Sequence, residues 1–252
     1  MVVDKIGILA QILRESSNAV FFGGAGVSTE SGVPDFRSES GLYAAQEKYG
    51  YTPEDMLSRS FFRRRTELFF QYYKENLVHL DVKPNAAHEA LAWLEANGPL
   101  KAIVTQNVDG LHQAAGSRNV IELHGGNSRH YCMSCGLAQD LAYVLDVANC
   151  DGYVPKCPKP DCGGIVRPDV VLYEEQLNEA VIDAALTAIE AADTLIIGGT
   201  SLVVYPAAAM IHHFRGKSIA LINKSSTGHE GRANLVINDS IGKVLGEVVK
   251  LL

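Results

Sequence analysis

The chain has 252 residues, 47% of them hydrophobic and 20% charged, which is enough for one large buried core or one core with a smaller attached module. Its 22 basic and 29 acidic residues give a net charge of −7, which argues against a protein that coats nucleic acid phosphates. No apolar run approaches the length of a membrane span and no basic-then-apolar leader opens the chain, so we expect a cytoplasmic location.

The first half of the chain predicts helices and buried strands separated by irregular segments. Ile6, Leu9 and Leu13 form one apolar stripe behind Asp4 as N-cap, which predicts an opening helix over 4–16. Pro, Gly and Asn residues mark the later boundaries. The further expected elements are a strand over 19–22, an irregular segment over 28–53, a helix over 61–76, a helix from Pro84 to Asn97-Gly98, and strands over 102–105 and 120–123.

The second half resumes this alternation after a cysteine-bearing stretch, 126–168. The expected elements are strand 169–172, helix 178–190, strand 194–198, helix 205–213, strands 218–222 and 235–237, and helix 241–251. Strands that alternate with helices predict an α/β fold with a mainly parallel sheet covered on both faces. We expect residues 1–37, 81–125 and 169–252 to form this large domain, and 38–80 and 126–168 to form a small one across a cleft.

Four cysteines have the spacing of a metal site. Cys132 and Cys135 form one pair, and Cys157 and Cys162 form a second. Four thiolates fill a tetrahedral Zn²⁺ shell at about 2.3 Å each and leave no position for a water, so such a zinc is structural and not catalytic. Cys150 and His130 are competing ligands for the same ion.

A glycine turn follows the first predicted strand. Gly24-Ala25-Gly26 would let a phosphate group approach backbone N–H groups at the start of the next helix. The third glycine of the usual dinucleotide fingerprint is missing, because Val27-Ser28-Thr29 follows. The turn alone therefore leaves a nucleotide site and a simple tight turn both open.

Polar residues also follow four other predicted strands. Gln106, Asn107 and Asp109 come after 102–105, and His124 comes after 120–123. Gly199-Thr200-Ser201 and Asn223 end two more strands. Any one of these could be an ordinary loop residue, but the carboxyl ends of parallel strands meet at one edge, where open α/β sheets bind ligands. A histidine there suits general base catalysis, because its pKa lies near neutrality.

These segments resemble the signatures of the sirtuin family. GAGVSTESGVPDFR at 24–37 is similar to its cofactor loop, and TQNVDGLH at 105–112 and ELHG at 122–125 are similar to its second and third signatures. The cysteine pairs, RPDVV at 167–171, GTSL at 199–202 and Ile222-Asn223 extend the resemblance to roughly residues 6–250. It implies a Rossmann-like NAD-binding domain, a small helical and zinc-binding lobe, and NAD-dependent protein-lysine deacetylase (deacylase) activity. NAD is then a co-substrate that yields nicotinamide, free lysine and O-acetyl-ADP-ribose.

The resemblance also implies roles for individual residues. His124 would be the general base, and Asn107 would help position the ribose or a water. Phe36 would shield the reactive carbon, Asp109 would hold the carboxamide, and segment 171–174 would hydrogen-bond to the acyl-lysine peptide like an added strand. The implied cofactor-binding residues are Gly24, Ala25, Gly26, Thr29, Phe36, Arg37, Gln106, Val108, Asp109, Thr200, Ser201 and Asn223, and the implied zinc ligands are Cys132, Cys135, Cys157 and Cys162.

Two positions depart from patterns within the family. Gly23 stands where many relatives have Thr, which we expect to affect packing only. Relatives specialised for succinyl or malonyl lysine carry a Tyr and an Arg three residues apart, where this chain has Phe70 and Tyr73. The cation for an acidic acyl group is therefore missing, and we expect acetyl to be preferred.

Other functions fit part of the pattern. An NAD-dependent dehydrogenase with a structural zinc would carry the complete three-glycine fingerprint. A protein ADP-ribosyltransferase would use the same fold, and a non-enzymatic zinc-containing interaction module would use only the cysteines. The basic cluster Arg63-Arg64-Arg65 is interpreted as a solvated helix face, so nucleic acid is not expected as a partner. The oligomeric state is left open.

Overall fold

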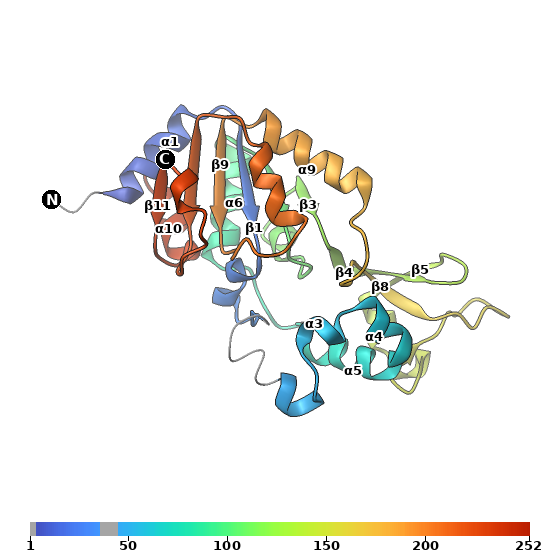
Figure 1. Ribbon diagram of the computed structural model, residues 1–252. Coiled ribbons are helices and arrows are strands. Elements are labelled where there is room, and N and C mark those ends of the chain that lie inside the picture. The colour runs from blue at the N-terminus through green and yellow to red at the C-terminus, as the bar shows by residue number, and fades with distance from the viewer. Residues whose placement is uncertain (1–3, 36–44) are drawn as a thin grey trace.

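A computed structural model describes residues 4–35 and 45–252. Its larger part is a six-stranded sheet in the order β11-β10-β9-β1-β2-β3, in which every neighbouring pair is parallel (Figure 1). The strands are β1 (Ala19–Gly23), β2 (Leu100–Thr105), β3 (Val120–Glu122), β9 (Thr194–Gly198), β10 (Ser218–Ile222) and β11 (Leu235–Ile237).

Helices cover both faces of this sheet, as expected from the alternation. Successive side chains of a strand point to opposite faces, so Phe21 and Phe22 of β1 enter two different cores. On the Phe21 face lie α1 (Lys5–Glu15), α6 (Ala86–Asn97) and α10 (Ile241–Val248), and on the Phe22 face lie α9 (Glu179–Ala191) and the 3₁₀ helix η4 (Ala207–His213). The predicted α/β fold class is confirmed.

Side-chain caps fix where two of these helices begin. Asp4 accepts a hydrogen bond from the Gly7 backbone N–H at 2.9 Å, as predicted for the first helix. The prediction that Pro84 starts the next long helix was wrong, because α6 begins at Ala86. Asn85 is its N-cap: its side chain accepts from the Ala87 N–H, while its own N–H donates to His88 Nδ1.

A smaller lobe carries the cysteines and has its own core, built largely from aromatic side chains of α4 and α5. It contains the antiparallel sheet β5-β4-β8 and the two-stranded sheet β6-β7. Its elements are α3 (Pro53–Met56), α4 (Arg59–Arg64), α5 (Thr66–Asn76), β4 (Gly125–Cys132), β5 (Ala138–Asp140), α8 (Leu141–Leu145), η3 (Val147–Asn149), β6 (Cys150–Asp151), β7 (Val154–Pro155) and β8 (Val166–Val170).

Three expected elements differ from the structure. The strand predicted at 169–172 is β8, which ends at Val170 and pairs antiparallel with β4, so it belongs to the small sheet and not to the parallel one. The helix expected over 61–76 is two helices, because Arg65 leaves helical geometry at φ −136°, ψ 48°. The helix expected over 205–213 is the 3₁₀ helix η4.

Short turns complete the chain: η1 (Ala25–Val27), η2 (Thr29–Ser31), α7 (Leu111–Ala114) and η5 (Glu230–Arg232). The glycine turn thus leads into two 3₁₀ turns and not into a long helix. Within the described residues, no helix has the length and apolar character needed to span a membrane.

Candidate functional site

Three adjoining pockets form one groove at the carboxyl ends of β1, β2, β3, β9 and β10. The inner pocket lies against the glycine turn and residues 106–109. It shares Gly26, Thr200 and Ser201 with an outer pocket that reaches Asn223. It shares Gln106 and His124 with a third pocket, between the small lobe and segment 170–175. An extended ligand could therefore lie along the sheet edge and meet a second ligand at His124.

The glycine turn touches the loop after β9. The Gly26 N–H donates to the Gly199 carbonyl oxygen at 2.8 Å, and Gly199 adopts a φ of +58°. A Cβ on Gly26 would lie 2.9 Å from Gly199 Cα, so a side chain would push the two loops apart. Gly24, Ala25 and Gly26 line the inner pocket beside Thr200 and Ser201, and Thr29 and Asn223 line the outer one.

Gln106 joins the same two loops through its side chain. Its Nε2 donates to Thr200 Oγ1 at 3.0 Å and to the Gly23 carbonyl oxygen at 3.3 Å. Its backbone N–H also donates to the Gly23 carbonyl oxygen at 3.0 Å. These bonds fix the width of the groove between the ends of β1, β2 and β9.

A buried hydroxyl organises the next residues of the pocket. Ser28 Oγ donates to Asp109 Oδ2 at 2.7 Å and accepts from Asn107 Nδ2 at 3.0 Å. The other carboxylate oxygen, Oδ1, accepts from the Leu111 N–H at 2.9 Å. Asn107 and Asp109 are thus held in one network on the pocket wall.

The position of His124 defines its tautomer. It lies in the turn between β3 and β4, and its Nδ1 is 2.9 Å from the Gln106 carbonyl oxygen. A carbonyl oxygen can only accept, so Nδ1 carries the hydrogen and Nε2 carries the lone pair of the neutral ring. His124 itself lines both the inner and the third pocket.

The structure brings together most of the residues predicted from the sequence. Gln106, Asn107, Val108, Asp109 and His124 all line the inner pocket. Phe36 and Arg37 lie outside the described residues. Other residues that line this pocket were assigned no role from the sequence, among them Ser28, Leu77, His79 and Asn127. Ser28 stood inside a quoted signature, whereas the other three reach the pocket from the small-lobe side and no local pattern marks them.

The third pocket has mostly apolar walls. Leu57, Val171, Leu172 and Val204 line it, and among the described residues no lysine or arginine does. Tyr173 is already bonded on one side: its N–H donates to the Leu57 carbonyl oxygen at 3.0 Å, and its carbonyl oxygen accepts from the Arg59 N–H at 2.9 Å. Residues 171–174 all line this pocket.

Phe70 and Tyr73 are fully buried in the small-lobe core and do not line the third pocket. The Tyr73 hydroxyl is 3.0 Å from His130 Nε2. Burial raises the pKa of Tyr73 far above its usual value, so this phenol stays neutral at physiological pH. These two positions place no cation at the pocket.

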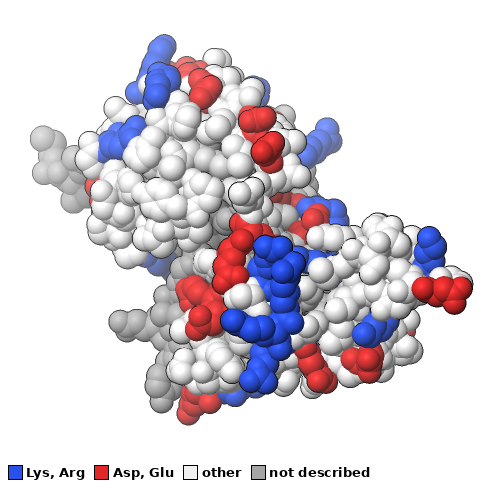
Figure 2. All heavy atoms as spheres, turned by 45° about the vertical axis from the view of Figure 1, so that its right-hand side comes forward, with Lys and Arg blue, Asp and Glu red and all other residues white. Residues whose placement is uncertain are grey.

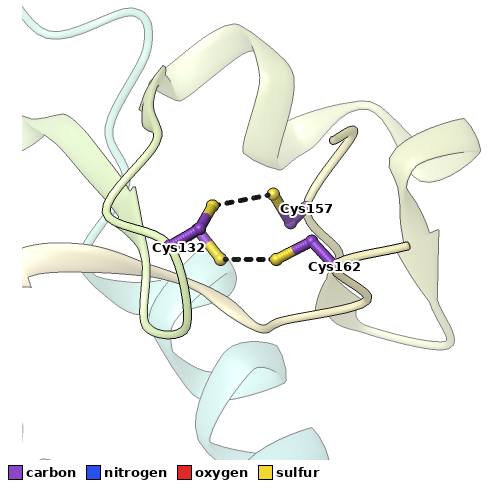
Figure 3. A group of neighbouring side chains, drawn as sticks. Cys132, Cys157 and Cys162 are labelled. Atoms are coloured by element: carbon purple, nitrogen blue, oxygen red, sulfur yellow. Dashed lines mark hydrogen bonds between the residues drawn. The ribbon is translucent and has the colours of Figure 1, made fainter. Parts of the chain in front are cut away.

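The four predicted cysteines converge in the small lobe. The Sγ atoms of Cys132 and Cys162 lie 3.6 Å apart, as do those of Cys135 and Cys157, and all four lie within 4.8 Å of one another (Figure 3). Sulfurs at about 2.3 Å from a central Zn²⁺ would be about 3.8 Å apart in a tetrahedron, so the spacing fits this ion.

Neither competing ligand belongs to the four-cysteine cluster. Cys150 Sγ lies 3.3 Å from Lys74 Nζ, and His130 is bonded to Tyr73. Gly164 passes close to the cluster, since a Cβ there would lie 2.7 Å from Cys132 Sγ.

Charge on the small lobe is mixed. Figure 2 shows Lys and Arg side chains in a band over this lobe, with Asp and Glu side chains beside them, and much of the larger body uncharged on the same face. Arg63, Arg64 and Arg65 are exposed at the end of α4. Interleaved charge of this kind is typical of a solvated surface.

Comparisons with known proteins agree with this site. The sequence profile of the Sir2 family matches residues 24–206. An NAD-dependent protein deacetylase of Clostridium acetobutylicum is 58% identical over 249 residues, which cover 99% of this chain and 100% of that protein. One of Clostridium perfringens is 60% identical over 247 residues, which cover 98% and 99%.

Solved structures are similar over the whole chain as well. A Sir2 homologue in complex with NAD superimposes with a TM-score of 0.86 at 37% identity, covering 97% of this chain and 93% of that chain. A Sir2 complex with a p53 peptide and NAD⁺ has a TM-score of 0.85 at 33% identity, covering 100% and 98%.

Proposed function

The chain belongs to the Sir2 family, and from that premise we infer that it is an NAD-dependent protein deacetylase. The observation that carries this inference is the single groove whose two arms meet at His124. One arm runs along the polar loops at the sheet edge from residues 106–109 to Asn223, and the other is lined largely by apolar side chains. A reaction between a nucleotide and a long side chain fits this arrangement.

We propose that NAD lies along the inner and outer pockets. Asn223, Thr200 and Ser201 would hold its adenosine half and phosphates, beside the glycine turn Gly24–Gly26 and Thr29. The close contact between Gly26 and Gly199 favours this, because it holds the glycine turn and the loop after β9 side by side along the two pockets. Gln106, Val108 and Asp109 would surround the nicotinamide and its ribose, with Phe36 and Arg37 expected beside them.

NAD would supply an electrophilic ribose carbon when nicotinamide leaves, and the acetyl oxygen of the acetyl-lysine would attack there. His124 Nε2 would accept the proton of a ribose hydroxyl, while its Nδ1–H stays bonded to the Gln106 carbonyl oxygen. Asn107 would orient the ribose or a water. The walls are mainly neutral, which suits a developing positive charge because few nucleophiles compete for it.

Acetylated lysine in proteins or peptides would enter through the third pocket. Segment 171–174, which lines this pocket, would pair with the substrate backbone, a mode of recognition that favours extended peptides. The absence of lysine and arginine from the described walls of this pocket supports a preference for neutral acyl groups over succinyl or malonyl.

The four cysteines would bind one structural Zn²⁺. A shell of four thiolates leaves no coordination position for a substrate, so the metal would stabilise the small lobe and take no part in the chemistry. We also propose that residues 38–80 and 126–168 act as this lobe. Five cysteines without a disulfide favour a reducing compartment, which supports the proposed cytoplasmic location.

Product analysis tests the proposed activity. The protein is incubated with an acetyl-lysine peptide and NAD, and the products are identified by mass spectrometry. We expect deacetylated peptide, nicotinamide and O-acetyl-ADP-ribose in equal amounts. Peptide that gains an ADP-ribose mass instead would show that the alternative, protein ADP-ribosyl transfer, is correct.

A further inference from the structure

Asn127, on β4, carries an amide oxygen that has no partner. The residue is 6% exposed and lines the inner pocket, and its Oδ1 is buried without a hydrogen-bond partner among the described residues. Buried side-chain oxygens in folded proteins nearly always have a partner, so an exception at a ligand pocket calls for an explanation. A ligand that brings a hydrogen-bond donor into the inner pocket would supply the missing partner.

The neighbours of Asn127 fix which end of its amide is the oxygen. Asn127 Nδ2 donates to the Leu77 carbonyl oxygen at 2.7 Å. A carbonyl oxygen can only accept, so exchanging the two ends of the amide would set two acceptors against each other. The Asn127 N–H donates to the Val108 carbonyl oxygen at 2.8 Å, which also holds the backbone. The side chain therefore cannot turn its oxygen to a partner without breaking an existing bond.

The same two bonds place Asn127 beside the expected position of the acyl group. Leu77 and Val108 line both the inner and the third pocket, whereas Asn127 lines the inner one. In the proposed function the lysine enters through the third pocket and its acyl oxygen reacts in the inner one. The acyl group then lies in the pocket that Asn127 lines, on the side of the two residues bonded to it. We therefore assign the unpartnered oxygen to the acyl group.

His79 adds a second unpartnered polar atom to the inner pocket. It lines this pocket as well, and its Nε2 is buried without a partner among the described residues. The methyl group of an acetyl offers neither atom a hydrogen bond. A hydroxyl both donates and accepts, so it can serve an amide oxygen and an imidazole nitrogen of either tautomer. A carboxylate only accepts, and it would face the Asn127 oxygen with a second acceptor.

We propose that the protein also removes short hydroxyacyl groups from lysine, and that Asn127 Oδ1 selects them by accepting a hydrogen bond from the acyl hydroxyl. This rests on the proposed function, because the reaction is the same. The amide bond to lysine breaks, nicotinamide leaves NAD, and with one water the hydroxyacyl group becomes an ester of ADP-ribose. The acyl hydroxyl itself does not react. The substrate class is a neutral acyl group with a hydroxyl on its second or third carbon.

Matched peptide pairs test the role of this oxygen. One pair carries propanoyl-lysine and 2-hydroxypropanoyl-lysine, and the other carries butanoyl-lysine and 3-hydroxybutanoyl-lysine. For each peptide, kcat/KM is measured by nicotinamide release in wild type and in Asn127→Leu, since Leu is close to Asn in shape but cannot accept a hydrogen bond. We expect the ratio of kcat/KM between the hydroxylated and the plain peptide to be about tenfold higher in wild type for at least one pair.

Asn76→Leu is the matched control. Asn76 Nδ2 also donates to a backbone oxygen of the small lobe, that of Tyr72 at 3.0 Å, but the residue lines none of the three pockets of the groove. Its ratios should equal those of wild type. Because each ratio compares two substrates of one protein, the fraction of protein that is folded cancels from it.

Ratios that differ by less than about twofold between wild type and Asn127→Leu for both pairs would overturn the proposal, as would an equal change in Asn76→Leu. Unchanged ratios would follow if Asn127 bonded to nicotinamide instead, because that group is common to all four reactions. A wild-type protein that releases no nicotinamide with any acyl-lysine peptide, acetyl included, would instead refute the proposed function itself.

Discussion

Arg167 makes a buried ion pair beneath the third pocket, and its removal should be strongly destabilising. Its side chain is 7% exposed and that of its partner Glu175 is 20% exposed, with N–O distances of 2.7 and 3.0 Å. The guanidinium also donates to the backbone oxygens of Pro168 and Val170. Arg167→Met keeps much of the apolar stem but leaves these three acceptors without their donor.

Breaking a buried pair from one side costs about 3 kcal/mol or more, because a desolvated charge is left behind. If the free energy of unfolding falls by about 3 kcal/mol per molar urea, the urea midpoint of Arg167→Met should lie about 1 M below that of the wild type. Arg129→Met is the matched control on the neighbouring strand. Arg129 also contacts two carboxylates, but its side chain is 51% exposed, so its loss should cost about 1 kcal/mol at most.

The stabilisation by the Arg167–Glu175 pair should decrease as the pH falls. Burial alone would raise the pKa of Glu175, but the hydrogen bonds from Arg167 and the Leu172 N–H outweigh it and lower the pKa below 4.5. The stabilisation is therefore present above pH 4.5 and is lost as the pH falls through the folded pKa. The difference in the free energy of unfolding between wild type and Arg167→Met should therefore become smaller below pH 4.5. If Arg167→Met and Arg129→Met lowered the free energy of unfolding equally, as measured by urea unfolding at neutral pH, this reasoning would be refuted.

Three further predictions concern the metal, a buried histidine and the acyl group. Cys157→Ser should abolish stoichiometric zinc, measured by elemental analysis, whereas Cys150→Ser should retain it; normal zinc in Cys157→Ser would exclude the four-cysteine site. Burial, followed by the neighbouring His88, lowers the pKa of His112 from 6.5 to about 3, so stability should be complete above pH 6.5 and fall below it. Between pH 7.5 and 5.5, the free energy of unfolding of His112→Phe should therefore fall by about 1.4 kcal/mol less than that of the wild type, as measured by urea titration. An equal fall in the two proteins would contradict the conclusion that burial lowers the pKa of His112. An acetyl-lysine peptide should be turned over at least about tenfold faster than its succinyl counterpart, and faster desuccinylation would contradict the argument from a pocket without lysine or arginine among its described lining residues.

Local signals in the sequence were sufficient for much of the large domain. The strands expected over 194–198, 218–222 and 235–237 begin and end at those residues, because each is a short apolar run with clear boundaries. The partner of a strand is not encoded locally. A strand over 169–172 was therefore expected in the parallel sheet, and only the pairing of β8 with β4 shows that this strand belongs to the small one.

In the candidate site too, some residues could be predicted from local sequence and others could not. Residues that follow strand ends, such as Asn107 and His124, could be predicted because the sheet itself brings those ends together. Leu77, His79 and Asn127 could not, because they reach the pocket only through the packing of the small lobe. The four-cysteine cluster was predictable from spacing, but separating Cys150 from it needed the position of its sulfur beside Lys74.

The most direct test of the account is deacetylation of an acetyl-lysine peptide by zinc-loaded protein, with and without NAD, beside His124→Ala. The account predicts turnover only with NAD, and a loss of about a hundredfold or more in the variant, because the general base is removed while the fold is kept. Turnover without NAD, or full activity in His124→Ala, would contradict it.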